Sequence, residues 1–553
     1  MEQRKPIAVL VGWLAGAGAG LALAAGGVLS RPAAFLLGLL PRRYSHYLLG
    51  GKLVPLHSRV LGIYLGLALA LLCGFALLYR YLWRRPDFAF LKTGRGKFLF
   101  VILVVLALLT LSLSVNRVFW DDEIEHIHAS WYVQNGQVPY RDFFEHHHPL
   151  FWFLLAPFLS VFGEGLAVLA VLRLLMLLMA AGIAWLTWRI SRLANGSVET
   201  AWLAVAILFS NLLFLPCVME IRPDIPMVLL ALAALERLLV FMKWGKPKQL
   251  LAAAFMAALS FLFLQKAILL FPVAALLLCS WRFEGRISSA LFWKTIAVFL
   301  LPLMLFTAWL FLVGALHDYF LCNWLLNLNR QRDVSRWLIL GRLALVNIVF
   351  WLCLLPALLH SLRSEKSAAA MKVAAWTGFA ALAALFLLPN PADRHFLLAL
   401  PLLSVVVAGW VGDRLRFSLP GKWRMICLAG LLVVPLPFLA MLGSPLNGVQ
   451  LEKITYVLRQ TAPADKVFDG RNDFNLFRPD LHYFWFNVDL GVLEDYRRSG
   501  GSSRHADYDI CRLIGERQPR FIRFDNREWN TCRVWRDYVP TPYAGLFIRE
   551  MGR

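Results

Sequence analysis

The chain has 553 residues, of which 59% are hydrophobic and only 16% are charged. This balance excludes an ordinary soluble globular protein and predicts a polytopic α-helical membrane protein. The net charge of +22 does not indicate nucleic-acid binding, because the Lys and Arg residues are spread over short loops between apolar runs. Such spreading is typical of membrane proteins oriented by the positive-inside rule.

The first 96 residues form an N-terminal region with two apolar runs, at about 7–30 and 60–82. We interpret the first run as a retained span, although the small residues of Ala22-Leu23-Ala24 leave a cleaved signal open. The second run leads into a loop with six Lys and Arg residues, which is expected to be cytoplasmic. The region is therefore expected to place two transmembrane helices before the rest of the chain.

A transmembrane core is predicted over residues 97–443. Its spans are expected at 98–115, 165–188, 199–219, 224–242, 249–264, 267–281, 291–314, 337–359, 371–388, 394–412 and 423–443, which makes about 13 in the whole chain. The run 150–163 is too short and too Pro-broken to cross, so it reads as re-entrant or interfacial. Because every second loop is basic, the loop 116–163 and the segment after 443 are both expected on the outer face.

The outer loop begins with a dense group of acids and histidines. A helix of about 20 Å is predicted from Asp121 or Asp122 to Asn135-Gly136, with Asp122 and Glu125 at capping-box spacing. We expect it to lie along the membrane surface. Asp122 could be only a helix cap. The three histidines 146–148 invite a metal site, but consecutive side chains point in different directions and no Cys lies nearby, so the sequence argues against it.

Residues 444–553 have no long apolar run and are expected to form one small α/β domain on the outer face. Strand-like stretches occur at 466–468 and 521–524, and a helical one at 451–460. If the outer face is oxidising, Cys511 and Cys532 are candidates for a disulfide.

Several charged residues stand at the outer ends of apolar runs, where charges are costly and therefore mark functional candidates. They are Arg173, Arg222, Asp224, Lys266, Arg394 and His395. Each alone could pair locally or reach the lipid headgroups. Together with Asp122, Asp142 and His148 they all gather at one face, where cations could hold a lipid-borne phosphate and a carboxylate could act as general base. Glu236 and Arg237 are interpreted as a structural pair nearer the opposite face.

The ordered set of motifs resembles the C-type glycosyltransferases, in the branch of protein O-mannosyltransferases and lipid A aminoarabinose transferases. It consists of Asp122-Glu123, Gly136-x-x-Pro139-Tyr140-x-Asp142, His148-Pro149-Leu150, Arg222-Pro223-Asp224, Lys266 and Arg394-His395. The resemblance covers about 98–443 and implies that Asp122 is at the catalytic centre. Because the Asp is doubled, either Asp121 or Asp122 could match the family's catalytic Asp. The two N-terminal spans depart from the usual core.

The function expected from these residues is inverting glycosyl transfer from a polyprenyl-phosphate sugar to a lipid, glycan or protein acceptor. Asp122, Asp142 and Glu123 are the catalytic candidates, and Lys266, Arg222, Arg394 and Arg173 would bind the donor phosphate. Further site candidates are Asp121, His147, His148, Asp224 and His395. No cofactor is assigned, a divalent cation is left open, and the expected location is a bacterial inner membrane with the site on the periplasmic face. The alternatives are a carrier or flippase for lipid-linked saccharide, and a polymerase or ligase using a pyrophosphate-linked donor.

Overall fold

The computed structural model describes residues 91–329, 347–364, 368–385, 393–417, 421–433, 447–486, 491–501, 508–523 and 536–550, with four isolated positions besides. The first predicted N-terminal span, all but one position of the second, and Cys532 lie outside these described residues.

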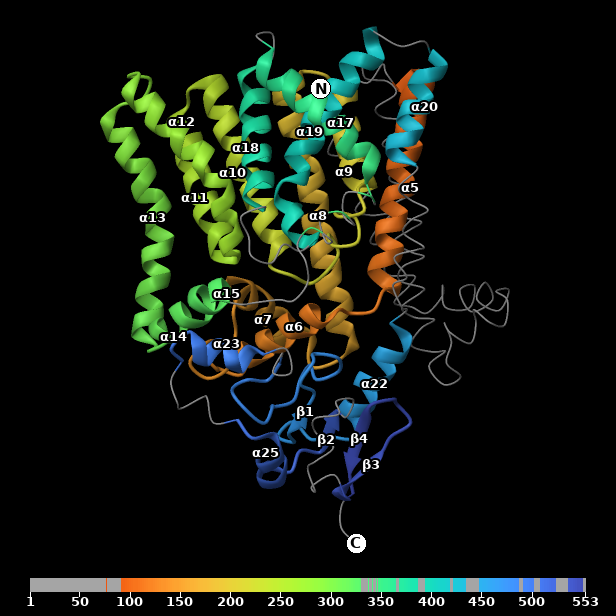
Figure 1. Cartoon of the computed structure of the whole chain (residues 1–553), viewed down its shortest axis with the longest axis vertical. Coiled ribbons are helices and arrows are strands. Elements are labelled where there is room, and N and C mark those ends of the chain that lie inside the picture. The colour runs from red at the N-terminus through yellow and green to blue at the C-terminus, as the bar shows by residue number, and fades with distance from the viewer. Residues whose placement is uncertain are drawn as a thin grey trace, which may run out of the picture.

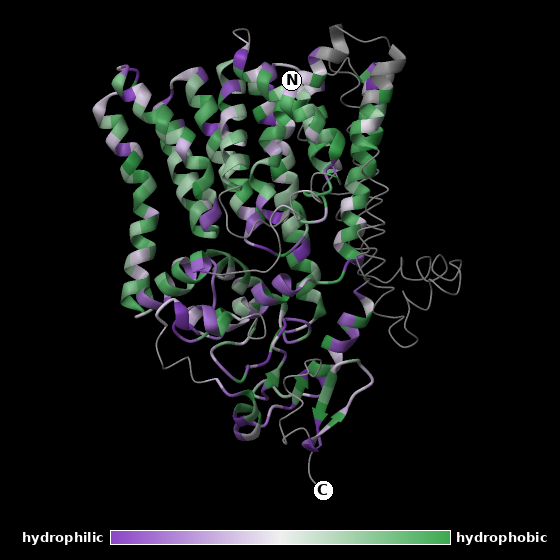
Figure 2. Cartoon of the chain, viewed as in Figure 1, coloured by the Kyte–Doolittle hydropathy of each residue, from purple (hydrophilic) through white to green (hydrophobic). Residues whose placement is uncertain are grey.

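Most described helices run side by side in one bundle (Figure 1). They are α5 (Gly94–Asn116), α8 (Leu166–Asn195), α9 (Val198–Ser210), α10 (Asp224–Trp244), α11 (Pro247–Phe263), α12 (Phe271–Phe283), α13 (Ser289–Leu312), α17 (Ile348–Arg363), α18 (Ala369–Leu385), α19 (Leu400–Phe417) and α20 (Gly421–Leu432). The 3-10 turns η2 (Gln265–Leu270) and η4 (Asp393–Leu398) lead into α12 and α19. Hydrophobic residues dominate the bundle, and polar ones gather at its two ends and below it (Figure 2).

Among the described residues, five helical segments are long and apolar enough to cross a membrane, so the chain is a multi-pass membrane protein. One predicted span is shorter than expected. The run 199–219 is helical only to Ser210, because the Asn211 side chain accepts a hydrogen bond from the Leu213 N–H at 2.9 Å and competes with the helical bonding. Turns follow up to Asp224, and these turns carry Glu220 and Arg222 into the site described below.

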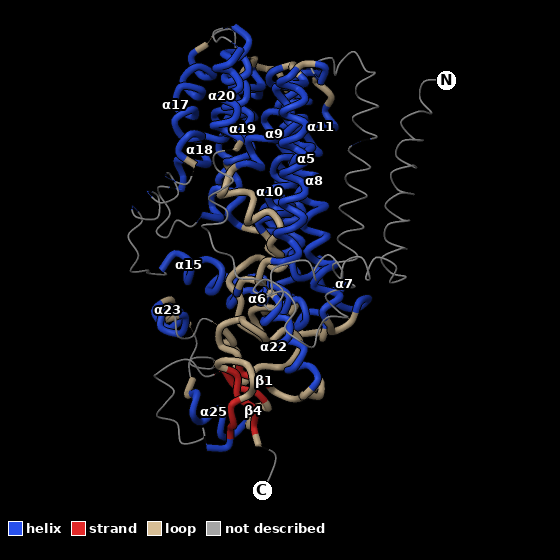
Figure 3. The backbone as a smooth tube through the Cα atoms, turned by 90° about the vertical axis from the view of Figure 1, so that its right-hand side faces the viewer, coloured by secondary structure: helices blue, strands red, loops and turns tan. Residues whose placement is uncertain are grey.

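A second layer of short helices lies across one end of the bundle (Figures 1 and 3). It contains α6 (Asp121–Gln134), α7 (Leu150–Phe162), α14 (Leu316–Phe320), the π-helical turn η3 (Leu321–Leu325), α15 (Leu326–Asn329) and α23 (Val492–Arg498). The predicted helix is α6, and Gly136 ends it with a φ of +79° as expected. The predicted cap is wrong: Trp120 is the N-cap residue, and its N–H donates to the Glu123 carboxylate at 3.1 Å.

Helix α6 does not span the bundle but lies across one end of it, and protein covers it there (Figure 1). Ile124 and Ile127 are fully buried, and so are the polar side chains of His126 and His128. The C-terminal part of the chain covers α6: His128 contacts Asp480 at 2.6 Å, and the Tyr132 hydroxyl donates to the same carboxylate at 3.1 Å. The helix is therefore enclosed by protein, and contacts with the C-terminal part of the chain help to fix its orientation.

The C-terminal domain has the predicted α/β character. Its described elements are α22 (Gly448–Arg459), β1 (Val467–Phe468), α25 (Ile510–Arg517), β2 (Phe521–Arg523), β3 (Tyr538–Pro540) and β4 (Leu546–Arg549). The sheet order is β1-β2-β4-β3, with β1 parallel to β2 and both other pairings antiparallel. Cys511 is disulfide-bonded. The domain lies at the same end of the bundle as α6, as the loop charges predicted (Figure 1).

Candidate active site

Asp122 lies near the N-terminus of α6 and faces two arginines from other parts of the bundle. Its Oδ2 accepts a hydrogen bond from Arg222, in the turn before α10, and another from Arg394, in η4, at 2.6 Å. The Asp122 side chain is 24% exposed, so solvent can reach it although two arginines hold it in place. Asp121 is exposed, and its carboxylate accepts the Asp122 N–H at 3.1 Å. The structure therefore puts Asp122, not Asp121, against the arginines.

A second carboxylate, Asp224, lies at the start of α10 and shares the same cations. Its Oδ2 is 3.3 Å from Arg222 Nε, and its Oδ1 is 3.3 Å from Lys266 Nζ in η2. His395 lies close enough to interact electrostatically with Asp224. Five residues that the sequence singled out in four separate stretches thus meet in one cluster: Asp122, Arg222, Asp224, Lys266 and Arg394.

The structure adds two residues that the sequence did not single out, Glu220 and Arg117. Glu220 is buried, 3.1 Å from Arg117, 3.5 Å from Arg394 and 3.9 Å from Arg222. Both residues flank apolar runs at their outer ends, so the criterion that selected Arg222 could have found them. We define the outer charged cluster as Asp122, Glu220, Asp224, Arg117, Arg222, Lys266 and Arg394. Histidines apart, these described side chains carry a formal excess of one positive charge.

Arg173 and Glu123 are not part of that cluster, although both were site candidates. Both are almost fully buried and face each other: the Arg173 guanidinium donates to both Glu123 oxygens, at 3.1 and 2.9 Å. Arg173 also donates to the carbonyls of Ser114, Arg117 and Val118 at 2.7–3.0 Å. Its donors thus engage the end of α5, the link to α6 and the first turn of α6, which carries Asp122. The predicted roles of Arg173 in phosphate binding and of Glu123 in catalysis stay predictions.

Asp142, the predicted second catalytic carboxylate, lies in the turn after α6. Its Oδ2 accepts a hydrogen bond from the Val138 N–H at 2.7 Å. The Arg141 guanidinium donates to each of its two oxygens at 2.8 Å. These partners of the Asp142 carboxylate belong to the same turn as Asp142 itself. The catalytic role of Asp142 stays a prediction.

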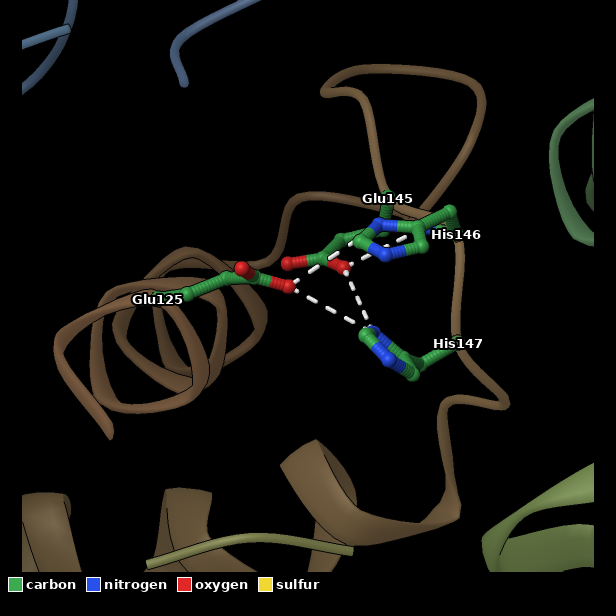
Figure 4. Close-up of side chains that lie close together, drawn as sticks. All are labelled: Glu125, Glu145, His146 and His147. Atoms are coloured by element: carbon green, nitrogen blue, oxygen red, sulfur yellow. Dashed lines mark hydrogen bonds and ion pairs between the residues drawn. The ribbon is translucent and has the colours of Figure 1, made fainter. Parts of the chain in front are cut away.

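A separate group of acids and histidines lies beside α6, one helical turn beyond Asp122. Glu125 from α6 meets Glu145, His146 and His147 from the following loop (Figure 4), and one ligand atom from each lies within 4.8 Å of the others. Burial and the nearby Glu125 raise the pKa of the Glu145 carboxyl well above its usual range. The three histidines do not all converge, as predicted: His146 and His147 approach Glu125, whereas His148 is not part of the group.

His148 turns away from its neighbours into a buried aromatic environment. Its Nε2 is 3.1 Å from the Tyr319 hydroxyl, and burial lowers its pKa to about 3. His126, also on α6, accepts a hydrogen bond from the Trp152 indole at 3.2 Å, and its ring packs against that of His147. Burial, reinforced by His147, lowers the pKa of His126 well below its usual range. Both rings are therefore neutral at pH 7.

Parts of the chain are similar to known proteins. A sequence model of the dolichyl-phosphate-mannose-protein mannosyltransferases matches residues 146–311. No curated protein sequence matches the chain. The fold is similar to the crystal structure of ArnT from Cupriavidus metallidurans in the apo state, with 13% identity and a TM-score of 0.51. The similarity covers 70% of this chain and 85% of that one.

Two further structures are similar at lower scores. ArnT from Cupriavidus metallidurans bound to undecaprenyl phosphate gives 15% identity and a TM-score of 0.47 over 67% of this chain and 73% of that one. The oligosaccharyltransferase of Archaeoglobus fulgidus in the apo form has 13% identity and a TM-score of 0.49. The similarity covers 77% of this chain and 69% of that one. The family model thus matches one part of the chain, and the fold is similar to that of ArnT.

Proposed function

We propose that this protein transfers a sugar from a polyprenyl-phosphate donor to an acceptor hydroxyl or amine, with inversion at the anomeric carbon. The observation that carries the proposal is a reachable carboxylate, Asp122, held between two arginines at one end of an apolar bundle. The matching family model, which describes mannosyltransferases that use dolichyl-phosphate-mannose, supports this class of donor.

In the proposed reaction the acceptor oxygen or nitrogen attacks the anomeric carbon from the side opposite the phosphate. The bond between that carbon and the phosphate oxygen breaks, and the polyprenyl phosphate leaves with the electron pair. Asp122 takes the proton of the acceptor as general base. Arg222, Arg394 and Lys266 stabilise the charge on the departing phosphate, so no general acid is required.

The pairing of Asp122 with both arginines has a consequence for the order of events. Two cations disfavour protonation of a carboxylate, so Asp122 is a poor base in the arrangement described. A donor phosphate would compete with Asp122 for Arg222 and Arg394. Once they turn to the phosphate, Asp122 regains its affinity for a proton. Donor binding would thereby activate the base.

The charge of the outer charged cluster favours a phosphodiester donor. A sugar-phosphate-polyprenol carries one negative charge, which matches the formal excess of one positive charge among the described cluster residues. A pyrophosphate-linked donor carries two and would leave the cluster with a net negative charge. This argument favours glycosyl transfer from a monophosphate donor over the polymerase or ligase alternative.

An apolar cavity of about 300 Å³ supplies a place for part of the lipid chain. It lies between α10, α11, α12, α13 and α18 and is lined by side chains such as Leu235, Ala253 and Phe271. One lining residue, Leu270, is four positions after Lys266. A phosphate held at Lys266 would therefore leave its isoprenoid chain beside this cavity. The bacterial inner membrane, with the site on the periplasmic face, is the location that we propose.

The test uses purified protein in lipid nanodiscs with a panel of polyprenyl-phosphate sugars, and measures released polyprenyl phosphate together with the anomeric configuration of the product. We expect release from at least one monophosphate donor and an inverted product. Binding of the donors without release would favour the carrier or flippase. Release from pyrophosphate donors alone would favour the polymerase or ligase.

A further inference from the structure

The cluster of Glu125, Glu145, His146 and His147 has the composition and the spacing of a metal site (Figure 4). The nitrogen His147 Nδ1 is 3.4 Å from Glu125 Oε1 and 3.8 Å from Glu145 Oε2, and His146 Nδ1 is 3.9 Å from Glu125 Oε1. Four ligands at about 2.0–2.1 Å from a tetrahedral zinc ion stand about 3.4 Å apart. The observed spacing needs only small side-chain rotations to reach that geometry.

The charges of these four side chains also favour a bound cation. Both glutamates are buried, and both histidine side chains are at most 14% exposed. Two carboxylates brought together out of water repel each other, and burying charge without compensation is costly. The Glu145 Oε1 and His147 Nδ1 atoms are buried with no hydrogen-bond partner among the described residues. One divalent cation would neutralise both carboxylates and engage both nitrogens.

The surrounding structure holds the loop that presents three of the four side chains. The His147 carbonyl accepts hydrogen bonds from the Tyr140 hydroxyl and from the Asn323 amide. The His146 carbonyl accepts one from Asn327 at 2.9 Å, and the Trp485 indole donates to the Phe144 carbonyl, also at 2.9 Å. Tyr140 lies in the same loop, Asn323 and Asn327 come from η3 and α15, and Trp485 comes from the C-terminal domain. The backbone is thus fixed from two sides before any ion arrives.

We propose that Glu125, Glu145, His146 and His147 bind one divalent first-row transition ion, with zinc the best fit. Imidazole ligands favour such ions over Mg²⁺ and Ca²⁺, which prefer oxygen ligands alone. Four protein ligands in a nearly closed site are typical of a structural ion. The ion links the loop to α6 three residues after Asp122, on the same side of the helix. It therefore positions the start of α6, and the proposal does not depend on the transfer reaction.

The experiment titrates Co²⁺ into the full-length protein after chelator treatment and dialysis, and records visible absorption. We expect one equivalent to give the strong visible bands of a four-coordinate site, which Zn²⁺ abolishes and excess Mg²⁺ does not. Glu145→Gln and His147→Ala should each weaken Co²⁺ binding at least tenfold. Asp142→Asn, a carboxylate change in the same loop outside the cluster, should bind as the unaltered protein does.

A second measurement guards against variants that fail to fold. Zinc should raise the unfolding temperature of the unaltered chelated protein, and should not raise that of Glu145→Gln. The proposal is overturned if the unaltered protein shows no Co²⁺ bands and no zinc-dependent stabilisation. It is equally overturned if the ligand variants bind Co²⁺ as tightly as Asp142→Asn does, because the ion would then sit elsewhere.

Discussion

Arg173 on α8 donates hydrogen bonds to both oxygens of Glu123 on α6, at 3.1 and 2.9 Å, with both side chains almost fully buried. Glu123 also accepts the Ile221 N–H at 3.1 Å. One buried ion pair thus ties together the start of α6 and the turn that carries Glu220 and Arg222. The residue before Glu123 is Asp122, so the pair sets where the proposed base lies.

Arg173→Met should be strongly destabilising, because it leaves Glu123 charged and buried without a partner. Breaking a buried pair in this way costs about 3–5 kcal/mol, whereas replacing both partners costs much less. Adding Glu123→Gln to Arg173→Met should therefore restore much of the thermal stability in detergent. A stable Arg173→Met protein with reduced donor affinity would instead return Arg173 to the phosphate site that the sequence suggested.

Asp122→Asn should preserve fold and donor binding and lower turnover by about 10² to 10⁴, the usual contribution of a positioned base. The measurement is the rate of polyprenyl phosphate release at saturating donor. Asp121→Asn is the matched control, one residue away and exposed, and should have a mild effect. Loss of transfer in Asp121→Asn alone would shift the catalytic register by one. Normal turnover in both would favour the carrier.

Lys266→Ala and Arg222→Ala should each weaken donor binding about ten- to hundredfold, since a charge-assisted hydrogen bond contributes about 1.5–3 kcal/mol. Affinity is measured by titrating a fluorescent polyprenyl-phosphate sugar into protein in nanodiscs. Lys243→Ala is the control, because Lys243 lies in the last turn of α10, whereas the cluster meets its first residue. Unchanged affinity in both cluster variants would remove them from the donor site.

The outer loop and the C-terminal domain should be labelled from the same side of the membrane. We expect cysteines introduced at Asn135 and Ala464 to react with an impermeant maleimide from the periplasmic side, and one at Lys246 only from the cytoplasmic side. The alternation of basic loops requires this result. Reaction of Asn135 and Ala464 from opposite sides would be incompatible with the fold.

The disulfide at Cys511 is expected to join Cys532, 21 residues further on. Closing a loop of that size contributes about 3 kcal/mol in the chain-entropy model. Peptide mapping of protein prepared without reductant should recover the linked pair, and reductant should lower the unfolding temperature of the C-terminal domain. Recovery of Cys532 as a free thiol would exclude this pairing.

The sequence by itself determined the class of fold. Apolar runs, basic loops and the ordered motifs predicted a polytopic C-type glycosyltransferase fold with a small α/β domain. These signals are local: the length and hydrophobicity of a run decide whether it crosses a membrane, whatever its neighbours do. The charges at span ends also predicted which side chains share a face. For that reason Asp122, Arg222, Asp224, Lys266 and Arg394 could be named before the fold was known.

Only the tertiary structure decided what each of those charges does. Arg173 and Arg222 look alike in sequence, since both are arginines near the outer end of a span. Packing buries Arg173 against Glu123 and leaves Arg222 facing Asp122. The same holds for the histidines: consecutive residues normally diverge, but the turn at 144–148, fixed by Asn323, Asn327 and Trp485, brings His146 and His147 to Glu125. Side-chain partners far apart in sequence depend on backbone paths that no local pattern contains.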